Sequence, residues 1–166
     1  MIREIVNTDW PQIMRIQSQV YHDVVPEPLE VMQGKWLRSP QLCFVYCCDT
    51  NPAQIGGYIL AHTWAGESLP ELGQSLSKGV VEEYVFLHDL AISPEYQGQG
   101  VGPLLAEFLL ARAQKSGWQE FRLVSVQGSV PFWQRFGFML LKQTVSECYG
   151  EDAAVMTKTE RVYESL

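Results

Sequence analysis

The amino-acid sequence predicts a mixed α/β fold, with a central twisted sheet that is partly antiparallel and partly parallel and has helices on both faces. In the first half, apolar runs at residues 42–48 and 55–64 are separated by a short turn segment, which is typical of antiparallel strands. In the second half, strand-like and helix-like segments alternate, which favours mostly parallel pairing through right-handed crossovers. From the length of 166 residues we expect one domain covering residues 1–166.

The elements of the first half follow from capping and turn residues. Thr8 or Asp9 can cap a first helix, because their side-chain oxygens accept hydrogen bonds from its free N–H groups, and Pro11 is tolerated in the first turn. Residues 49–52, Asp-Thr-Asn-Pro, favour a turn. We therefore expect, in order, a strand at 2–6, a helix ending near residue 21, a helix at 29–37, and strands at 42–48 and 55–64.

The second half opens with a loop-like segment at 65–79, which is rich in Gly, Ser and Pro and carries Glu67 and Glu71. A loop of this length is usually functional or mobile. The later helix is amphipathic, and Gly117 can end it. Its apolar face is predicted to hold Val101, Leu104, Leu105, Phe108 and Leu109. The elements expected are a strand at 84–92, a helix at 101–115, a strand at 121–126, a short helix at 131–136, and strands at 138–145 and 153–159.

The composition is that of a globular protein, with 46% hydrophobic and 19% charged residues. A net charge of −7 argues against nucleic acid as a partner, because phosphate binding needs clustered Lys and Arg. No run approaches the roughly 18–20 apolar residues that span a bilayer, and the first residues lack a secretory signal, so we expect a cytoplasmic protein with no membrane partner. The cysteines lack metal-ligand spacing, and we expect no metal site.

A glycine-rich segment lies between the strand at 84–92 and the helix at 101–115. Its glycines let the backbone turn tightly and point several N–H groups at one spot, and the helix N-terminus adds about half a positive charge. The segment therefore predicts an anion site that needs no Lys or Arg. The dinucleotide fingerprint G-x-G-x-x-G fails here at Pro103, and the P-loop fails at Leu104. The segment consists of Gln97, Gly98, Gln99, Gly100, Val101 and Gly102.

Three segments resemble the GNAT superfamily of acyl-CoA N-acyltransferases. Residues 90–102 read LAISPEYQGQGVG and contain its acyl-CoA loop, Q/R-x-x-G-x-G/A. Residues 130–138, VPFWQRFGF, resemble its later signature, and residues 55–60 resemble its third strand, so the likeness covers nearly the whole chain in the right order. The segments at 87–92 and 130–133 also resemble arylalkylamine N-acetyltransferases, and those at 61–64, 87–90, 126–129 and 149–153 resemble an uncharacterised bacterial GNAT subgroup.

This resemblance implies an N-acetyltransferase that moves an acetyl group from acetyl-CoA to a primary amine by direct attack in a ternary complex. A small-molecule amine is the main hypothesis for the acceptor. A protein or peptide amine is one alternative, and a non-catalytic acyl-CoA-binding regulatory domain is another. The sequence leaves open whether two copies pair as a homodimer.

The resemblance also implies an acetyl-CoA site. It places the pyrophosphate on the glycine-rich segment, and a backbone N–H at residues 90–92, where GNAT strands carry a bulge, on the thioester carbonyl. Ser129 lies near where relatives hold the pantetheine chain, but of its two possible roles we favour a cap on the helix that follows. The implied acetyl-CoA contacts are Leu90, Ala91, Ile92, Gln97, Gly98, Gln99, Gly100, Val101, Gly102, Ser129, Phe132 and Trp133.

His88 is the candidate base, because an imidazole titrates near neutral pH and the residue matches a strand histidine that is the base in the arylalkylamine enzymes. The second histidine of their relay is Phe86 here. By the period-two geometry of a strand, Asp89 should point to the opposite face from His88, where it can either support the structure or bind the substrate cation from a neighbouring cleft. The implied acceptor contacts are Tyr21, Glu27, Trp64 and Asp89.

The acid that protonates the leaving thiolate is less clearly marked. Trp133 stands where many relatives carry a tyrosine, and an indole N–H can hydrogen-bond sulfur but does not protonate it usefully. Tyr149, in an expected flexible turn beside Gly150, is the alternative acid. Otherwise the thiolate leaves unprotonated, since a thiol pKa of roughly 8.5 makes a tolerable leaving group.

Overall fold

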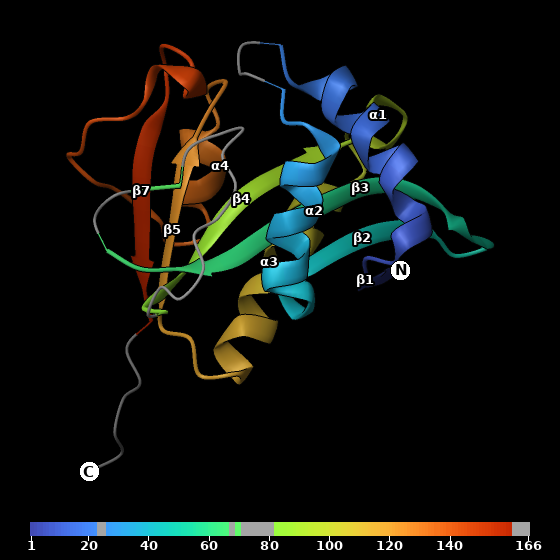
Figure 1. Ribbon diagram of the computed structural model, residues 1–166, viewed down its shortest axis with the longest axis horizontal. Helices are drawn as coiled ribbons and strands as arrows, with labels where there is room; N and C mark the ends of the chain where they lie inside the picture. Colours follow the sequence, from blue (N-terminus) through green and yellow to red (C-terminus); the bar gives the residue numbers. More distant parts are fainter. Residues whose placement is uncertain (23–25, 67–68, 71–81, 161–166) are drawn as a thin grey trace.

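The computed structural model describes residues 1–22, 26–66, 69–70 and 82–160. These residues form a seven-stranded sheet in the order β1-β2-β3-β4-β5-β7-β6 (Figure 1). The strands are β1 (Ile2–Glu4), β2 (Cys43–Cys48), β3 (Asn51–Trp64), β4 (Tyr84–Ile92), β5 (Glu120–Ser125), β6 (Met139–Leu140) and β7 (Ala154–Thr159). The α-helices are α1 (Trp10–Val20), α2 (Leu29–Arg38), α3 (Val101–Lys115) and α4 (Val130–Gln134).

Helices cover both faces of this sheet. On one face, α3 and α4 pack in a core that contains Leu105 of α3, Trp133 of α4 and Phe121 of β5. On the other face, α1 and α2 pack in a second core that contains Ile13 of α1 and Met32 of α2. The layers can be followed in Figure 1. The predicted mixed α/β fold is confirmed, because each amphipathic helix buries its apolar face against the sheet.

Strand pairing is antiparallel from β1 to β4, and again between β5, β7 and β6. Within the described sheet, β4 and β5 form the one parallel pair. The prediction of mostly parallel pairing in the second half is therefore wrong. The reason is the shortness of α4, whose five residues rise only about 7 Å and cannot carry the chain back along the sheet. The chain runs instead through β6 to β7, which returns beside β5 in the opposite direction.

Most predicted elements begin and end within two residues of their observed bounds, and two strands differ. Strand β3 begins at Asn51, inside the predicted turn at 49–52, so the turn is tighter than expected. Strand β6 covers Met139–Leu140 instead of residues 138–145, because its pairing with β7 extends over two positions.

Two further expectations concern residues of the second half. Leu104, predicted on the apolar face of α3, is 48% exposed, whereas its neighbour Leu105 is fully buried. The predicted loop at 65–79, with Glu67 and Glu71, lies largely outside the described residues.

The pairing of β4 with β5 is short, and this positions the site. Residues 85–87 of β4 pair with residues 121–123 of β5, while β4 continues to Ile92 without further partners in β5 among the described residues. The two strands separate beyond Leu87 (Figure 1). Space between the C-terminal ends of parallel strands is where α/β sheets commonly bind ligands.

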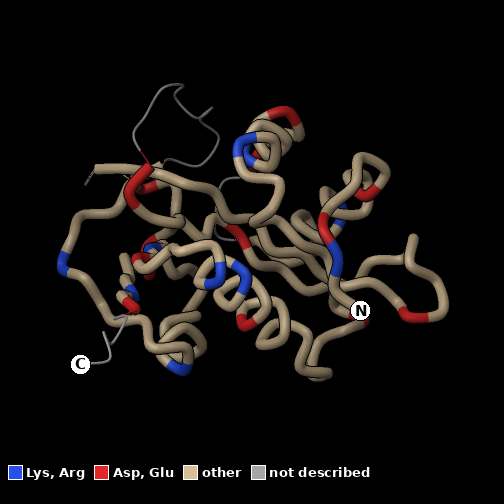
Figure 2. The backbone as a smooth tube through the Cα atoms, turned by 90° about the horizontal axis from the view of Figure 1, so that it is seen from below, with Lys and Arg blue, Asp and Glu red and all other residues tan. Residues whose placement is uncertain are grey.

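Charged residues are spread over the molecule. Figure 2 shows Lys and Arg scattered along the backbone rather than gathered on one face. In the part of the chain that the structure describes, no helix combines the length and the apolar character needed to cross a bilayer.

Two glycines provide a matched test of packing. A Cβ at Gly56 of β3 would lie 2.6 Å from Cγ of Tyr96, a ring atom that cannot move without displacing the side chain. We expect Gly56→Ala to lower the free energy of unfolding by about 1–3 kcal/mol, the usual cost of overpacking. A Cβ at Gly34 of α2 would have no atom within 4 Å, so Gly34→Ala should raise it by up to ~1 kcal/mol through helix propensity. Urea unfolding measures the change in the free energy of unfolding for both variants. If the two changes have the same sign, the packing described here is wrong.

Candidate active site

A β-bulge in β4 sets the directions of the site side chains. Leu60 of β3 pairs with Asp89, while Ala61 pairs with Leu87, so His88 is an extra residue in β4. As a result, His88 and Asp89 both point to the face that α1 and α2 cover, where they contact side chains of that layer. The prediction that Asp89 points away from His88 is therefore wrong, because the alternation of side chains fails at a bulge.

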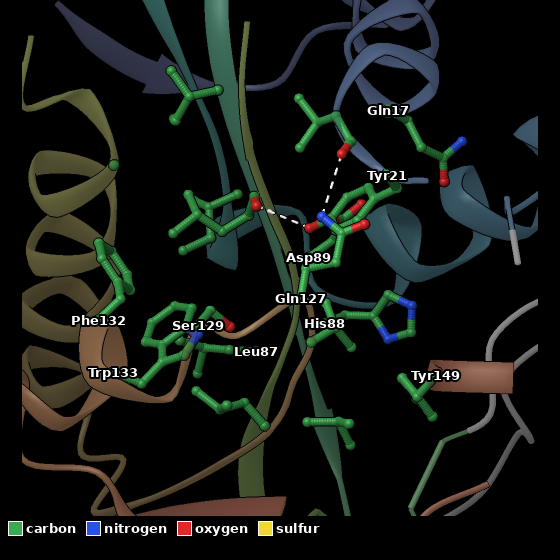
Figure 3. A pocket seen from close by; sticks show the side chains of 18 of the residues that line it. Gln17, Tyr21, Leu87, His88, Asp89, Gln127, Ser129, Phe132, Trp133 and Tyr149 are labelled. Atoms are coloured by element: carbon green, nitrogen blue, oxygen red, sulfur yellow. Dashed lines mark hydrogen bonds between the residues drawn. The ribbon is translucent and has the colours of Figure 1, made fainter. Parts of the chain in front are cut away.

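A cavity of about 340 Å³ lies between the separated ends of β4 and β5. The C-terminal part of α1 and the segment after it form one wall, and the loop after β5 with α4 forms another (Figure 3). The structure thus brings together residues from distant parts of the chain. The sequence candidates that line the cavity are Tyr21, Glu27, His88, Asp89, Leu90, Ile92, Gly102, Ser129, Phe132, Trp133 and Tyr149.

The remaining candidates lie outside this cavity. Ala91 is buried in the core beneath α1. Residues 97–100 form the exposed loop before α3, and Val101 is buried at the start of that helix. Trp64, at the end of β3, lies beneath the Arg38 guanidinium, 5.7 Å from its ring centroid. The structure therefore does not place Trp64 with the other predicted acceptor contacts.

Asp89 is a buried acid with one unpaired oxygen. The Tyr58 hydroxyl donates to its Oδ2 at 2.6 Å, while Oδ1 has no hydrogen-bond partner among the described residues. The Tyr21 hydroxyl donates to the Leu90 carbonyl at 2.9 Å and lies beside the carboxyl (Figure 3). Burial raises the pKa of Asp89, although the hydroxyls of Tyr21 and Tyr58 oppose that shift. An unpaired buried carboxyl oxygen on a cavity wall is suited to a cationic or N–H donor ligand.

Glu27, Lys35 and His88 form a buried polar cluster. Glu27 accepts a hydrogen bond from Lys35 Nζ, and its Oε1 lies 2.6 Å from His88 Nε2. Lys35 Nζ also lies 2.7 Å from that nitrogen. Burial alone would raise the pKa of Glu27, but His88 and Lys35 hold it down to about 2. His88 Nδ1 is buried and has no hydrogen-bond partner among the described residues.

The segment that carries Glu27 is held in place by α1. The side-chain amide of Gln17 accepts from the Glu27 N–H and donates to its carbonyl, each at 3.2 Å. Gln17, Lys35 and Tyr58 are site residues that were not predicted from the sequence. The sequence offered only a weak signal for them, a polar residue within an otherwise apolar helix face or strand. The contact itself could not be predicted, because Lys35 lies 53 residues from His88 along the chain.

A second histidine does lie near His88, although not at the position of Phe86. His62 of β3 pairs with Phe86 of β4, and its ring centroid lies 5.6 Å from that of His88. His62 Nδ1 lies 3.1 Å from the Thr63 carbonyl, which can only accept, so this nitrogen carries the hydrogen. Burial lowers the pKa of His62 well below its usual value. His62 is therefore neutral near neutral pH.

Trp133 and the candidate acid Tyr149 differ in their contacts. Trp133 packs edge-on against Phe132 and Phe138 at centroid distances of 4.9 and 5.6 Å. Tyr149 is 4% exposed in a short 3-10 helix (Glu147–Tyr149), not in the loose turn that was expected. Its hydroxyl donates to the Pro70 carbonyl.

Ser129 and Gln127 lie in the loop between β5 and α4. The Ser129 hydroxyl lies 2.8 Å from the Ser125 hydroxyl and makes no capping bond, so the predicted cap is wrong. Gln127 has a positive φ of 51°. Its side-chain amide donates to the Val20 carbonyl at 3.3 Å and accepts from the His22 N–H at 2.9 Å. Gln127 thus joins two walls of the cavity (Figure 3).

The loop before α3 has the backbone geometry of an anion site. Gly98 and Gly100 have φ angles of 79° and 76°, which glycine adopts without strain. The backbone N–H groups of residues 98–102 donate to no other described residue. These N–H groups lie at the N-terminus of α3, a 15-residue helix whose dipole adds partial positive charge there. Among the residues that the structure describes, no three His, Cys, Asp or Glu side chains are placed to hold a metal ion.

The low pKa of Glu27 makes a prediction about acid stability. A carboxyl whose pKa falls from 4.5 to about 2 on folding stabilises the folded state above pH ~4.5, and this contribution is lost as the pH falls towards 2. The free energy of unfolding of wild type should therefore exceed that of Glu27→Gln by roughly 2–3 kcal/mol at pH 6. This difference should disappear as the pH falls from ~4.5 to ~2. Urea unfolding across this range measures it, with Glu107→Gln, exposed on α3, as the control. A constant gap would refute the assignment.

Comparison with known proteins places this geometry in a family. The sequence profile of the Acetyltransferase (GNAT) family matches residues 7–138. No curated protein sequence matches the chain. Ard1 from Thermoplasma volcanium is similar in structure, with a TM-score of 0.73, 16% identity and 98% of both chains covered.

Two further solved structures show the same fold. The ribosomal-protein-S18-alanine N-acetyltransferase from Escherichia coli has a TM-score of 0.71 and 19% identity, over 100% of this chain and 97% of that one. A Mycobacterium tuberculosis protein in complex with CoA and NLQ has a TM-score of 0.70 and 13% identity, over 96% and 98% of the two chains. At these identities the structures establish the fold, while the profile covers more than half of the sequence. The chain belongs to the GNAT acetyltransferase family.

Proposed function

We propose that this chain transfers an acetyl group from acetyl-CoA to the primary amine of a small molecule, by direct attack in a ternary complex. The observation that carries the proposal is the cavity, which joins Gly102 at the start of α3 to the buried acids Glu27 and Asp89. One end suits an anionic cofactor and the other a cationic amine. Membership of the GNAT family supports acetyl-CoA as the donor.

The free backbone N–H groups at residues 98–102 support the binding of the CoA pyrophosphate, because they point donors and the positive end of α3 at one place. Ser129, Phe132 and Trp133 line the cavity beyond Gly102 and would contact the thioester arm. Bound acetyl-CoA supplies an activated acyl group. A backbone N–H of residues 90–92, just past the bulge, would polarise its carbonyl.

Two unpaired polar atoms support the amine end. We assign Asp89 Oδ1 as the anchor of the acceptor ammonium, and His88 Nδ1 as the base that takes its proton. Both atoms belong to residues that line the cavity, and both are buried without a hydrogen-bond partner among the residues that the structure describes. Tyr149 is not assigned as an acid, because its hydroxyl already donates to Pro70. The thiolate leaves unprotonated, which a thiol pKa of roughly 8.5 allows.

The cavity supports a small acceptor. Its volume of about 340 Å³ suits a small molecule, and Gln127 joins two of its walls. A peptide amine is the second candidate, favoured by the similarity to the S18-alanine N-acetyltransferase. Thiol release from acetyl-CoA with matched panels of small amines and of peptides with free N-termini separates the two. A regulatory acyl-CoA-binding domain would bind CoA and release no thiol with either panel.

The glycine-rich loop is tested by Gly100→Glu, which places a side chain and a negative charge at the anion site. We expect it to abolish CoA binding measured by calorimetry. Gly117→Glu is the matched control, because Gly117 also has a positive φ, 97°, and a Cβ placed there would have no atom within 4 Å, but it lies at the other end of α3. The control should bind CoA like wild type. If Gly100→Glu also binds normally, the loop is misassigned.

The amine end is tested by His88→Gln and Asp89→Asn. Loss of the base should lower kcat/KM by roughly 10²-fold or more and remove an ionisation from the low-pH limb of the rate profile. Loss of the anchor should mainly raise KM for the amine. Steady-state thiol release measures both, and His22→Gln, at an exposed histidine, is the control. An unchanged rate and an unchanged limb in His88→Gln would move the base role away from His88.

A further inference from the structure

The side-chain amide that joins two walls of the cavity binds backbone groups on both sides of Tyr21. Gln127 Nε2 donates to the Val20 carbonyl at 3.3 Å, and Gln127 Oε1 accepts from the His22 N–H at 2.9 Å. The backbone of Tyr21 is extended, with φ −94° and ψ 117°. A carbonyl and an N–H that flank one extended residue are the two groups that a strand offers to a parallel neighbour. The amide of Gln127 therefore occupies a place where an extended chain can pair.

Gln12 of α1 makes the same pair of contacts elsewhere in the molecule. Its Nε2 donates to the Ala53 carbonyl at 2.6 Å, and its Oε1 accepts from the Ile55 N–H at 3.0 Å. These two groups also flank one residue of β3, in the part of that strand before its pairing with β4 begins at Gly57. A glutamine amide thus takes the place of a neighbouring strand in β3, which supports the same interpretation of Gln127.

The amide of Gln127 lies where the cavity meets solvent, beside the proposed acceptor site. Gln127 is half-buried and His22 is exposed, while Val20, Tyr21 and Gln127 all line the cavity. The Tyr21 side chain extends from this segment to Asp89, the proposed anchor of the acceptor ammonium (Figure 3). A peptide whose amino group reached Asp89 would therefore run past Tyr21, along the two backbone groups that Gln127 occupies.

The backbone of Gln127 adopts a conformation that disfavours most side chains. Its φ of 51° is the one positive φ of a non-glycine residue in the part of the chain that the structure describes. A Cβ is unfavourable in this left-handed region, so contacts with the surroundings must hold Gln127 there. The two hydrogen bonds of its side chain are such contacts. A glycine at this position would adopt the same φ without needing them.

We propose that Gln127 is a specificity-determining residue whose amide excludes peptide acceptors by occupying the Val20 carbonyl and the His22 N–H. This inference rests on the function proposed above and narrows its acceptor to small amines. A small amine reaches Asp89 with both hydrogen bonds of Gln127 intact. An extended peptide has to displace the amide, and it then gains two backbone hydrogen bonds only by breaking two others.

Gln127→Met and Gln127→Gly test this exclusion by thiol release from acetyl-CoA, with trialanine compared with the small amine that wild type turns over fastest. Methionine has a similar length, but it has no N–H to donate and its thioether is a weak acceptor. Glycine adopts the positive φ without strain, so this variant should fold. In both variants, we expect kcat/KM for trialanine to rise roughly tenfold or more relative to kcat/KM for the small amine, because the competing hydrogen bonds are gone.

Gln12→Met is the matched control, because it removes the same pair of hydrogen bonds at a residue that does not line the cavity. It should keep the wild-type ratio of the two kcat/KM values. A wild-type ratio in Gln127→Met overturns the inference even if Gln127→Gly changes it, because the bulk of the side chain would then exclude the peptide without the amide.

Hydrogen exchange of the His22 amide gives a second readout that needs no turnover. In the free wild-type protein this N–H donates to Gln127 Oε1, so it should exchange roughly tenfold faster in Gln127→Met. The Ile55 amide, which Gln12 holds, should exchange faster only in Gln12→Met. NMR measures both rates. Equal exchange of the His22 amide in wild type and Gln127→Met overturns the inference.

The two readouts separate failure of the inference from failure of the proposed function. If wild type acetylates small amines and the ratio is unchanged in Gln127→Met, the function holds and the inference alone is wrong. If wild type prefers trialanine to every small amine, Gln127 does not exclude peptides. If wild type releases no thiol with any acceptor, the proposed function is wrong and the specificity role is lost with it, although faster His22 exchange would still establish the contacts of Gln127.

Discussion

The extra residue in β4 is the constraint on which the site depends. Pairing with β5 stops at Leu87, immediately before the bulge at His88, and a bulge bends the strand that carries it. The separation of β4 from β5 opens the cavity, and the bulge turns His88 and Asp89 into the same layer. With regular alternation, one of the two would face the core beneath α3, and the acidic end of the cavity would lose that polar side chain.

Burial of these groups is costly, and their partners offset the cost. Glu27 and Lys35 are nearly inaccessible to water, and an unpaired charge there would cost several kcal/mol, on the order of 3–5. Gln17 fixes the backbone of Glu27, and α2 supplies Lys35, so the cluster ties both helices of one layer to β4. Asp89 Oδ1 and His88 Nδ1 are among the buried polar atoms that have no hydrogen-bond partner in the described residues, and both belong to residues that line the cavity. A ligand that hydrogen-bonds to them there would offset the cost of its own desolvation.

In the proposed function, the two ends of the cavity would attract charged ligands by different physical means. At α3, backbone N–H groups and the helix dipole form the proposed anion site without a basic side chain, which agrees with a protein of net charge −7 whose Lys and Arg are scattered along the chain. At the other end, ionised and polar side chains are drawn from α1, α2 and β4. The proposed reaction needs both, because the donor is anionic and the acceptor cationic.

Local features were predictable from the sequence, and features that depend on partners distant along the chain were not. The bounds of β4 and α3 and the glycine-rich loop between them followed from hydrophobic periodicity and glycine geometry, which act over a few residues. The antiparallel return of β7, the bulge at His88 and the approach of Lys35 from α2 depend on which strands and helices pack together. A bulge is an offset in register between two strands, and neither strand alone records it. The sequence by itself therefore determined the family, the fold class and the position of the glycine-rich loop, while tertiary packing decided which way Asp89 points and which groups surround His88.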